Sequence, residues 1–243
     1  MMKYVEHLDW QVKDLMDSKK VILFIVEGPT DETSLSGILK KISKDKKVYF
    51  HLVNTDITSE LTSNTTNIIN KINDEIKKSI SKKYFKKSDI IQIIHIVDLD
   101  GVYIESHNIE YHDNDKIEYC LECIKTKNVQ GIIKRNNNKS EILNKLYLTK
   151  RINSIPYRIF FFSTNLEHVL HNVQNATREE KNILAQKFED EFYDKPEAFI
   201  EFINNEEFAI NKEYEETWKF IKHGTNSLKR YTNFNLYFTD ENI

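Results

Sequence analysis

Phe24-Ile-Val-Glu-Gly-Pro-Thr-Asp-Glu32 and Ile94-His-Ile-Val-Asp-Leu-Asp-Gly101 are the two stretches that decide the fold of this 243-residue chain. Each is a run of apolar, mostly β-branched residues that ends in carboxylates. Such a run is typical of a strand that is buried on both faces of a parallel sheet. Open α/β sheets bind their ligands at the carboxyl ends of the strands. We therefore expect the carboxylates of both stretches to share one crevice.

Similar strand patterns alternate with helical patterns outside these two stretches. Strands are predicted at 21–26, 48–53, 90–97 and 157–162, and helices at 3–17, 31–42, 68–80 and after 177. Strands that alternate with helices favour right-handed crossovers and a parallel sheet. The sequence therefore predicts an α/β fold with a parallel, doubly wound, Rossmann-like sheet.

Three regions are expected along the chain: an N-terminal helix at 1–19, an α/β domain at 20–175 and a helical C-terminal subdomain at 176–243. A basic helical insertion is predicted at about 116–155, because Ile117-Glu-Tyr-Cys-Leu-Glu-Cys-Ile124 has a helical pattern. Cys120 and Cys123 form a C-x-x-C without the second ligand pair that a structural zinc needs. We interpret them as packing or bystander thiols.

The composition is 40% hydrophobic and 30% charged, with a net charge of −3. No apolar run approaches the ~18–20 residues that span a bilayer, and the N-terminus mixes acids into its apolar pattern, so we expect a cytoplasmic protein without a membrane partner. Residues 116–158 carry ten Lys or Arg against three Glu, and residues 178–218 carry thirteen Asp or Glu against five Lys or Arg. The basic region is either a substrate-facing surface or an ordinary solvated one, and both interpretations stay open.

The acids of the two stretches have the arrangement of a divalent-metal site. Glu27 emerges directly from an apolar run, and Asp98 and Asp100 point to the same side of an extended segment. Buried carboxylates that converge repel one another unless a divalent cation neutralises them. We therefore expect Mg²⁺ or Mn²⁺ to bind oxygen ligands from Glu27, Asp31, Asp98 and Asp100. The alternative is that these acids begin a turn and cap a helix, and it is strongest for Asp31 and Glu32.

Val-Glu-Gly-x-x-Asp-Glu at 26–32, followed by Asp-x-Asp-Gly at 98–101, resembles the Toprim domain of topoisomerases, primases and OLD-type nucleases. The resemblance covers roughly residues 20–170. It implies a compact parallel α/β fold in which a Glu and an Asp-x-Asp bind Mg²⁺.

Phe161-Phe-Ser-Thr-Asn-Leu-Glu-His-Val-Leu-His171 is similar to a string found in RloB-like phage-defence Toprim proteins. Ser163, Glu167 and His171 are the matching positions, although the proline of that string is absent here. The match implies that Glu167 adds a carboxylate to the same crevice. A capped helix with a packed histidine is the alternative. His95, inside the third strand, is interpreted as a core histidine.

These observations predict a metal-dependent Toprim nuclease that hydrolyses phosphodiester bonds of DNA or RNA, including tRNA. The expected catalytic side chains are Glu27, Asp98, Asp100 and Glu167, with Glu32, Asp56 and His171 as secondary candidates. Basic residues are expected to hold the substrate's phosphates, namely Lys134, Arg135, Lys139 and Arg158.

The resemblance further implies an effector of anti-phage defence. The sequence has no P-loop, so any ATPase would be a partner protein, and a homo-oligomer is left open. Two other functions are also left open. One is a non-catalytic nucleotide- or metal-binding regulatory module, and the other is a small-nucleotide phosphohydrolase that uses the same metal site.

Overall fold

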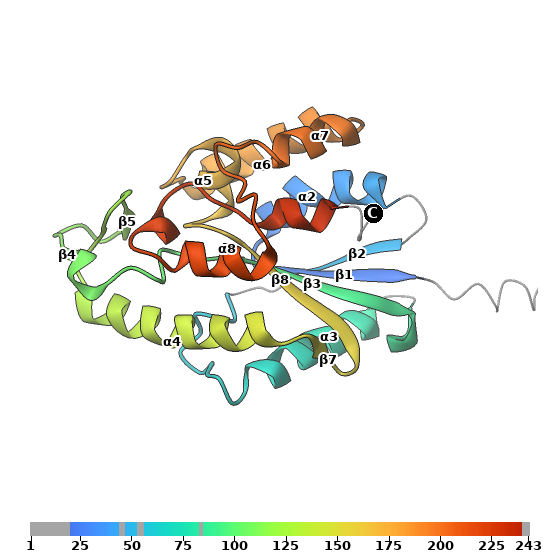
Figure 1. Cartoon of the computed structure of the whole chain (residues 1–243), viewed down its shortest axis with the longest axis horizontal. Helices are drawn as coiled ribbons and strands as arrows, with labels where there is room; N and C mark the ends of the chain where they lie inside the picture. Colours follow the sequence, from blue (N-terminus) through green and yellow to red (C-terminus); the bar gives the residue numbers. More distant parts are fainter. Residues whose placement is uncertain (1–19, 44–46, 53–55, 83–84, 240–243) are drawn as a thin grey trace, which may run out of the picture.

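A five-stranded sheet lies at the centre of the molecule (Figure 1). The computed structural model describes residues 20–43, 47–52, 56–82 and 85–239. The strands are β1 (Val21–Val26), β2 (Lys47–Leu52), β3 (Ile90–Asp98), β7 (Arg151–Ile152) and β8 (Ile155–Phe162). Their order in the sheet is β2-β1-β3-β8-β7, and all pairs are parallel except that of the short β7 with β8.

The prediction of a mixed α/β fold with a largely parallel sheet is confirmed. The helix predicted at 3–17, and with it the N-terminal region 1–19, lies outside the described residues. The part of the chain that the structure describes has seven α-helices. None of these described helices combines the length and the apolar character that crossing a bilayer requires.

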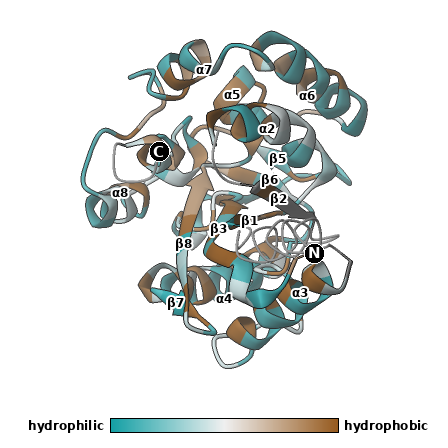
Figure 2. Ribbon diagram, turned by 90° about the vertical axis from the view of Figure 1, so that its right-hand side faces the viewer, coloured by the Kyte–Doolittle hydropathy of each residue, from teal (hydrophilic) through white to brown (hydrophobic). Residues whose placement is uncertain are grey.

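Helices cover both faces of the sheet. Alternate residues of β1 enter two hydrophobic clusters, with Val21, Leu23 and Ile25 in one and Ile22, Phe24 and Val26 in the other. This follows from the period of two along a strand, and it explains why β1 is apolar at every position. The first cluster is covered by α3 (Ile68–Lys82), α4 (Val129–Leu148) and α8 (Tyr214–Ile221), and the second by α2 (Pro29–Ile42), α6 (Arg178–Phe192) and α7 (Pro196–Ile203). Figure 2 shows the hydrophobic strands surrounded by helices whose outward sides are hydrophilic.

Local sequence signals set the helix boundaries. α2 starts at Pro29 and carries Asp31 and Glu32 in its first turn, where the helix dipole favours acids. α6 starts with a capping box in which Thr177 and Glu180 bond each other's backbone amides.

The strand order places a crevice beside β1. The chain passes from β1 through α2 to β2 on one side, and then through α3 to β3 on the other side of β1. A reversal of this kind leaves an opening at the carboxyl ends of the two diverging strands. Glu27 directly follows β1 and Asp98 ends β3, so both predicted acidic stretches lie at this opening.

The prediction of a helix at residues 117–124 is wrong. Here the chain forms a small sheet with the order β4-β6-β5, made of β4 (Ile109–Tyr111), β5 (Glu118–Tyr119) and β6 (Ile124–Thr126). The amide of Cys120 donates to the carbonyl of Cys123 at 2.9 Å and closes a turn between β5 and β6. Ile124 is fully buried in a cluster with Ile109 and Leu228, so contacts between distant residues override the local helical pattern.

The C-terminal region contains the predicted helices, and the chain then returns to the sheet. Thr232 pairs with Phe162 at the end of β8, and the side-chain oxygen of Asn233 accepts a bond from the amide of Phe161 at 3.0 Å. Trp218 of α8 lies in the first hydrophobic cluster and Phe234 in the second. The region predicted as a C-terminal subdomain therefore contributes to both cores.

Candidate active site

Six carboxylates lie at the carboxyl ends of the parallel strands, and sequence analysis named all of them. Each belongs to the segment that follows or ends a strand: Glu27 and Asp31 after β1, Asp56 after β2, Asp98 and Asp100 at β3, and Glu167 in α5 (Leu166–His171) after β8. Three cationic side chains approach them, namely Arg135, Lys139 and Lys181. The group therefore carries more negative than positive charge when all its members are ionised, and we call these nine side chains the acidic cluster.

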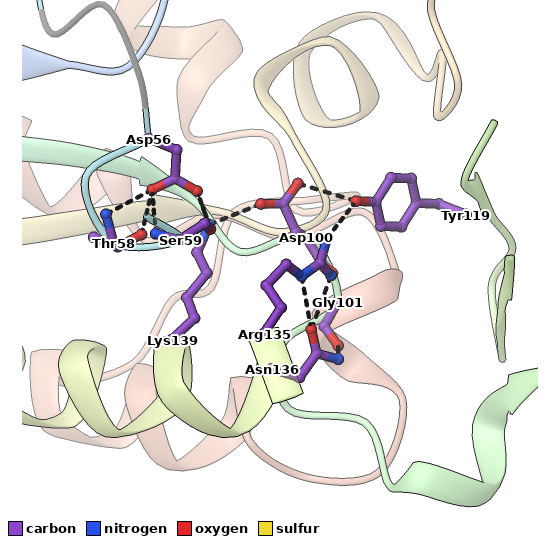
Figure 3. A network of polar contacts seen from close by, with 9 residues as sticks. All are labelled: Asp56, Thr58, Ser59, Asp100, Gly101, Tyr119, Arg135, Asn136 and Lys139. Carbon is purple, nitrogen blue, oxygen red and sulfur yellow. Dashed lines mark hydrogen bonds and ion pairs between the residues drawn. The ribbon is translucent and has the colours of Figure 1, made fainter. Parts of the chain in front are cut away.

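Lys139 connects two of the carboxylates (Figure 3). Its Nζ lies 2.5 Å from Oδ2 of Asp56 and 2.7 Å from Oδ2 of Asp100. The lysine side chain has no exposed surface. Although burial favours the neutral amine, the charges of Asp100 and Asp56 hold the Lys139 pKa well above its ordinary value. The residue is thus an internal counter-ion of the cluster.

Asp56 is held by more than this ion pair. Its carboxylate also accepts hydrogen bonds from the amides of Thr58 and Ser59, at 2.9 and 3.1 Å, and from both hydroxyl groups. Burial opposes ionisation of Asp56, but Lys139 and these donors keep its pKa below the usual range. Asp56 is therefore the anchor of Lys139, and its oxygens are already bonded.

The Asp-Leu-Asp-Gly turn after β3 is fixed by its backbone. Asp100 and Gly101 both have positive φ angles, 49° and 65°. The carbonyl of Asp100 accepts a bond from Nη2 of Arg135 at 2.9 Å. The amide of Asp100 donates to the carbonyl of Thr164 at 2.9 Å. The turn is thus tied both to α4 and to the segment that follows β8, and these two contacts hold the backbone that carries the Asp100 carboxylate.

Within the described residues, Glu27 has an unpaired carboxylate oxygen. Its Oε1 atom is buried and has no hydrogen-bond partner within the described residues. Burial raises the pKa of Glu27 well above its ordinary value, and the charge of Asp56 adds to the shift, while Lys139 opposes it. An unpaired buried carboxylate oxygen is costly unless a proton or a cation reaches it.

Glu167 and Lys181 form a second centre. Nζ of Lys181 lies 2.7 Å from Oε2 of Glu167, an ion pair that does not meet hydrogen-bond geometry, and Oε1 of Glu167 lacks a partner in the described part of the chain. Burial raises the pKa of Asp31 to about 6, the amide of Gly28 opposes that shift, and Glu167 adds to it. Sequence analysis missed Lys181, because it stands in the acidic stretch 178–218.

Asp98 lies between the two centres. It is half-buried, and the structure shows no hydrogen bond or ion pair to it from any described residue. Burial raises the pKa of Asp98 well above its usual value, and the charges of Asp31, Glu167 and Asp100 raise it further. Asp98 is therefore available to a ligand.

The donor chemistry fits a hard divalent cation. Mg²⁺ and Mn²⁺ prefer carboxylate oxygens, and Mg²⁺ keeps several waters, so only a few protein ligands are needed. Glu27, Asp98 and Glu167 offer oxygens without hydrogen-bond partners, and repulsion among the acids favours a cation there. In the described ranges, no three His, Cys, Asp or Glu side chains form a ready-made metal-binding group. Cation binding at this cluster therefore requires side-chain adjustment.

The four basic residues predicted to bind phosphate do not share one surface. Lys134 is exposed on α4. Arg135 donates to the hydroxyl of Tyr119 at 3.1 Å and, like Lys139, lies within the acidic cluster. Arg158 stacks over the ring of Tyr214, 4.3 Å from its centroid, and lines a separate cavity.

The remaining candidates lie beside the cluster. Glu32 is half-buried in the first turn of α2. His171 packs against the ring of Phe188, with a centroid distance of 5.5 Å, and burial lowers its pKa. His95 is a buried histidine whose Nδ1 lies 2.8 Å from the hydroxyl of Tyr157, as expected of a core histidine.

Comparison with known proteins adds no relative. No protein-family model matches this chain, and no significant match is found among curated proteins or among solved structures.

Proposed function

We propose that this protein is a metal-dependent nuclease that hydrolyses phosphodiester bonds of DNA or RNA. The observation that carries the proposal is that Glu27, Asp98 and Glu167 lie at the carboxyl ends of the parallel strands, where Glu27 and Glu167 have buried oxygens that lack partners among the described residues. When bound at these oxygens, Mg²⁺ or Mn²⁺ would activate water and stabilise negative charge on the leaving oxygen.

The residues of the cluster divide into two roles in this proposal. Glu27, Asp98 and Glu167 hold the cation, with Asp31 and Asp100 beside them. Lys139 and Arg135 act as positioning residues, because they fix the carboxylate and the carbonyl of Asp100. Lys181 reaches the cluster from α6 and is the cation closest to Glu167, so it is suited to meet a substrate phosphate.

The Toprim-like motifs supply the rest of the proposal. A Toprim frame, a role as an effector of anti-phage defence and an ATPase partner follow from resemblance, and a cytoplasmic setting follows from the sequence pattern. The order β2-β1-β3-β8 and the acids at the strand ends support such a frame.

A non-catalytic nucleotide- or metal-binding module is the second candidate. The short contacts of Lys139 with Asp56 and Asp100 favour it, because two carboxylates already have a counter-ion and the described acids form no ready-made metal group. In this case the crevice would bind a ligand without turnover.

Cleavage and metal binding should be measured together on the full chain. We expect the wild type to cut labelled DNA, RNA or tRNA in Mg²⁺ or Mn²⁺, and Glu27→Gln and Asp98→Asn to lower the rate at least ~100-fold, since several kcal/mol of charge stabilisation is lost. Calorimetry should show weaker Mn²⁺ binding in both variants. Asp190→Asn removes an exposed acid of α6 and is the matched control.

Each outcome separates the two functions. Cleavage that survives in Asp98→Asn rules out the nuclease site described here. Mn²⁺ binding without cleavage of any of these nucleic acids favours the binding module.

A further inference from the structure

A pocket of about 370 Å³ opens beside the acidic cluster, and Asp98, Asp100 and Lys181 line its inner side. β5 and the loop that precedes it line one part of the pocket, and the loop between α5 and α6 lines another. Its volume is close to the lower limit of the ~300–1,000 Å³ typical of small-molecule sites. The pocket therefore has room for a single small unit next to the cluster.

Besides residues of the cluster and the charged Lys116 and Glu118, the pocket has aromatic, apolar and amide side chains. Tyr119 contributes an aromatic ring, Ile117 an apolar side chain, and Gln174 an amide. Nucleobases that are not paired bind proteins by stacking on aromatic rings and by hydrogen bonds to their edges. A base inside a duplex exposes only its groove edges and cannot enter a pocket of this kind. The walls thus match an unpaired base.

Hydrogen bonds between distant segments hold the two walls together. The side chain of Asn175 accepts a bond from the amide of Tyr119 at 2.8 Å and donates to the carbonyl of the same residue at 2.7 Å. Nε2 of Gln174 donates to the carbonyls of Cys120 and Leu228, at 3.2 and 2.9 Å. A site that is fixed before its ligand arrives loses little conformational entropy on binding. These bonds also explain why residues 172–177 lie against β5.

Tyr119 links the pocket to the acidic cluster. Its hydroxyl lies 3.3 Å from Oδ1 of Asp100 and accepts a bond from Nη1 of Arg135 at 3.1 Å (Figure 3). A group that stacks on the Tyr119 ring therefore lies next to Asp100 of the acidic cluster.

We propose that this pocket binds one unpaired nucleoside while its phosphate lies at the acidic cluster. The proposal rests on the proposed function for the position of the phosphate, and it names the substrate class as single-stranded nucleic acid rather than duplex. A free nucleotide has the same chemistry as one unit of a strand, and the experiment below separates the two sources.

Binding should be measured by fluorescence anisotropy with the full chain in Ca²⁺, which takes oxygen ligands like Mg²⁺. The probes are labelled ten-nucleotide DNA and RNA strands, the same strands annealed to their complements, and unlabelled adenosine 5′-monophosphate as competitor. We expect at least one single strand to bind about tenfold tighter than its duplex. If adenosine 5′-monophosphate displaces the strand at a concentration near the dissociation constant of the strand, the ligand is a free nucleotide. If it does not displace the strand, the ligand is a polymer.

Two variants test the pocket itself. Ala176→Trp fills it from the rim of the α5–α6 loop, and we expect the single strand to bind at least tenfold more weakly. Tyr119→Ala should weaken binding about tenfold, because stacking contributes ~1–3 kcal/mol per base, whereas Tyr119→Phe keeps the ring and should weaken binding clearly less than Tyr119→Ala. Tyr111→Ala, which removes an exposed tyrosine of β4 outside the pocket, is the matched control.

The inference is overturned if duplex binds as tightly as single strand, if Ala176→Trp binds like the wild type, or if Tyr119→Phe is as weak as Tyr119→Ala. Failure of the proposed function looks different. A wild type that binds single strands through Tyr119 but cleaves nothing in Mg²⁺ or Mn²⁺ rejects the nuclease and leaves the pocket assignment intact.

Discussion

Lys139 illustrates how a single buried side chain stabilises the candidate site. It has no exposed surface, and its ammonium group lies within 2.7 Å of two carboxylates. Burial of an unpaired charge is unfavourable, so this arrangement is stable only while both signs are present.

Lys139→Met tests the ion pair. We expect the free energy of unfolding to fall by about 3–5 kcal/mol, because Asp56 and Asp100 would keep buried charges without their counter-ion. Urea denaturation measures the change. Lys77→Met breaks an exposed pair with Asp74 and should leave stability nearly unchanged. Equal stability of Lys139→Met and the wild type would contradict this account of the site.

The buried His95 makes the free energy of unfolding depend on pH. Burial lowers its pKa from 6.5 to about 4 in the folded protein. The unfolded chain therefore binds the proton more readily than the folded protein. The contribution of His95 to the free energy of unfolding, about 3 kcal/mol, is complete above pH 6.5 and is lost as the pH falls towards 4. We expect His95→Gln to remove this component from the pH dependence of unfolding.

The comparison must be made as a difference between variant and wild type. Asp31 has a raised pKa of about 6, and its effect has the opposite sign, because the folded state then binds the proton more readily. His107→Gln changes an exposed histidine and should retain the wild-type dependence. The same dependence in His95→Gln as in the wild type would show that His95 is not buried and neutral.

At this scale the sequence could predict the acids but not their partners. Glu27, Asp98 and Asp100 stand at the ends of apolar runs, and a local pattern reveals such positions. Lys139 and Lys181 reach the cluster from α4 and α6, which are separated in the chain from the strand ends that carry most of the acids. The ion pairs depend on how α4 and α6 pack, and no spacing along the sequence encodes that.

Among the elements, the turn after β3 shows why a glycine is required. Gly101 has a φ of 65°, and a Cβ added there would lie 2.4 Å from Cδ2 of Leu228. The residue is restricted both by its backbone conformation and by the small cluster around Ile124.

Gly101→Ala and Gly224→Ala form a matched pair for this point. Both glycines have positive φ, but no atom lies within 4 Å of the Cβ position of Gly224. We expect Gly224→Ala to lower the free energy of unfolding by about 1 kcal/mol through backbone strain alone. Gly101→Ala should cost clearly more, because Leu228 must also move. Thermal denaturation of the two variants measures both changes, and equal losses would mean that Leu228 does not restrict the turn.

Element prediction succeeded where a segment was continuously apolar or strongly periodic, and it failed at residues 117–124. The isoleucines of α3 recur at helical spacing, and β1, β3 and β8 are apolar runs. In each of these segments the local sequence alone indicates whether a helix or a strand forms. Residues 117–124 have a helical pattern only eight residues long, and the turn between Cys120 and Cys123 and the burial of Ile124 depend on β4 and Leu228. The small sheet, and with it one wall of the pocket, could not be predicted for this reason.

For the whole molecule, the packing of the C-terminal region determines how the chain unfolds. Trp218 and Phe234 lie in the two cores, and Thr232 pairs with β8. We therefore expect the region 176–239 to unfold together with the sheet in a single transition.

Trp10→Phe leaves Trp218 as the single tryptophan and makes its fluorescence a reporter of α8. We expect the fluorescence and far-ultraviolet circular dichroism transitions to coincide in urea, because two-state unfolding gives the same midpoint for every probe. An earlier fluorescence transition would show that α8 separates from the sheet first, as an independent subdomain would.

The metal proposal also has a consequence for the stability of the whole chain. We expect Mg²⁺ or Mn²⁺ to raise the melting temperature, with a gain of about 2.7 kcal/mol at a hundred times the dissociation constant. Glu27→Gln should be more stable than the wild type without metal, since burial and nearby acids disfavour its charge, and should gain less from metal. Asp190→Asn should gain as much as the wild type. An equal gain in Glu27→Gln would place the cation elsewhere.

The internal ion pairs of the cluster have one more consequence, for the order of events in the life of the protein. Because Lys139 and Lys181 already neutralise part of the acidic charge, a newly synthesised chain can complete its core before any metal arrives. Under the proposed function, loading with the cation is then a late and reversible step that follows the supply of free cations. We therefore expect a chelator to abolish the proposed activity without denaturing the protein, and the returned cation to restore it within the time of a simple binding reaction.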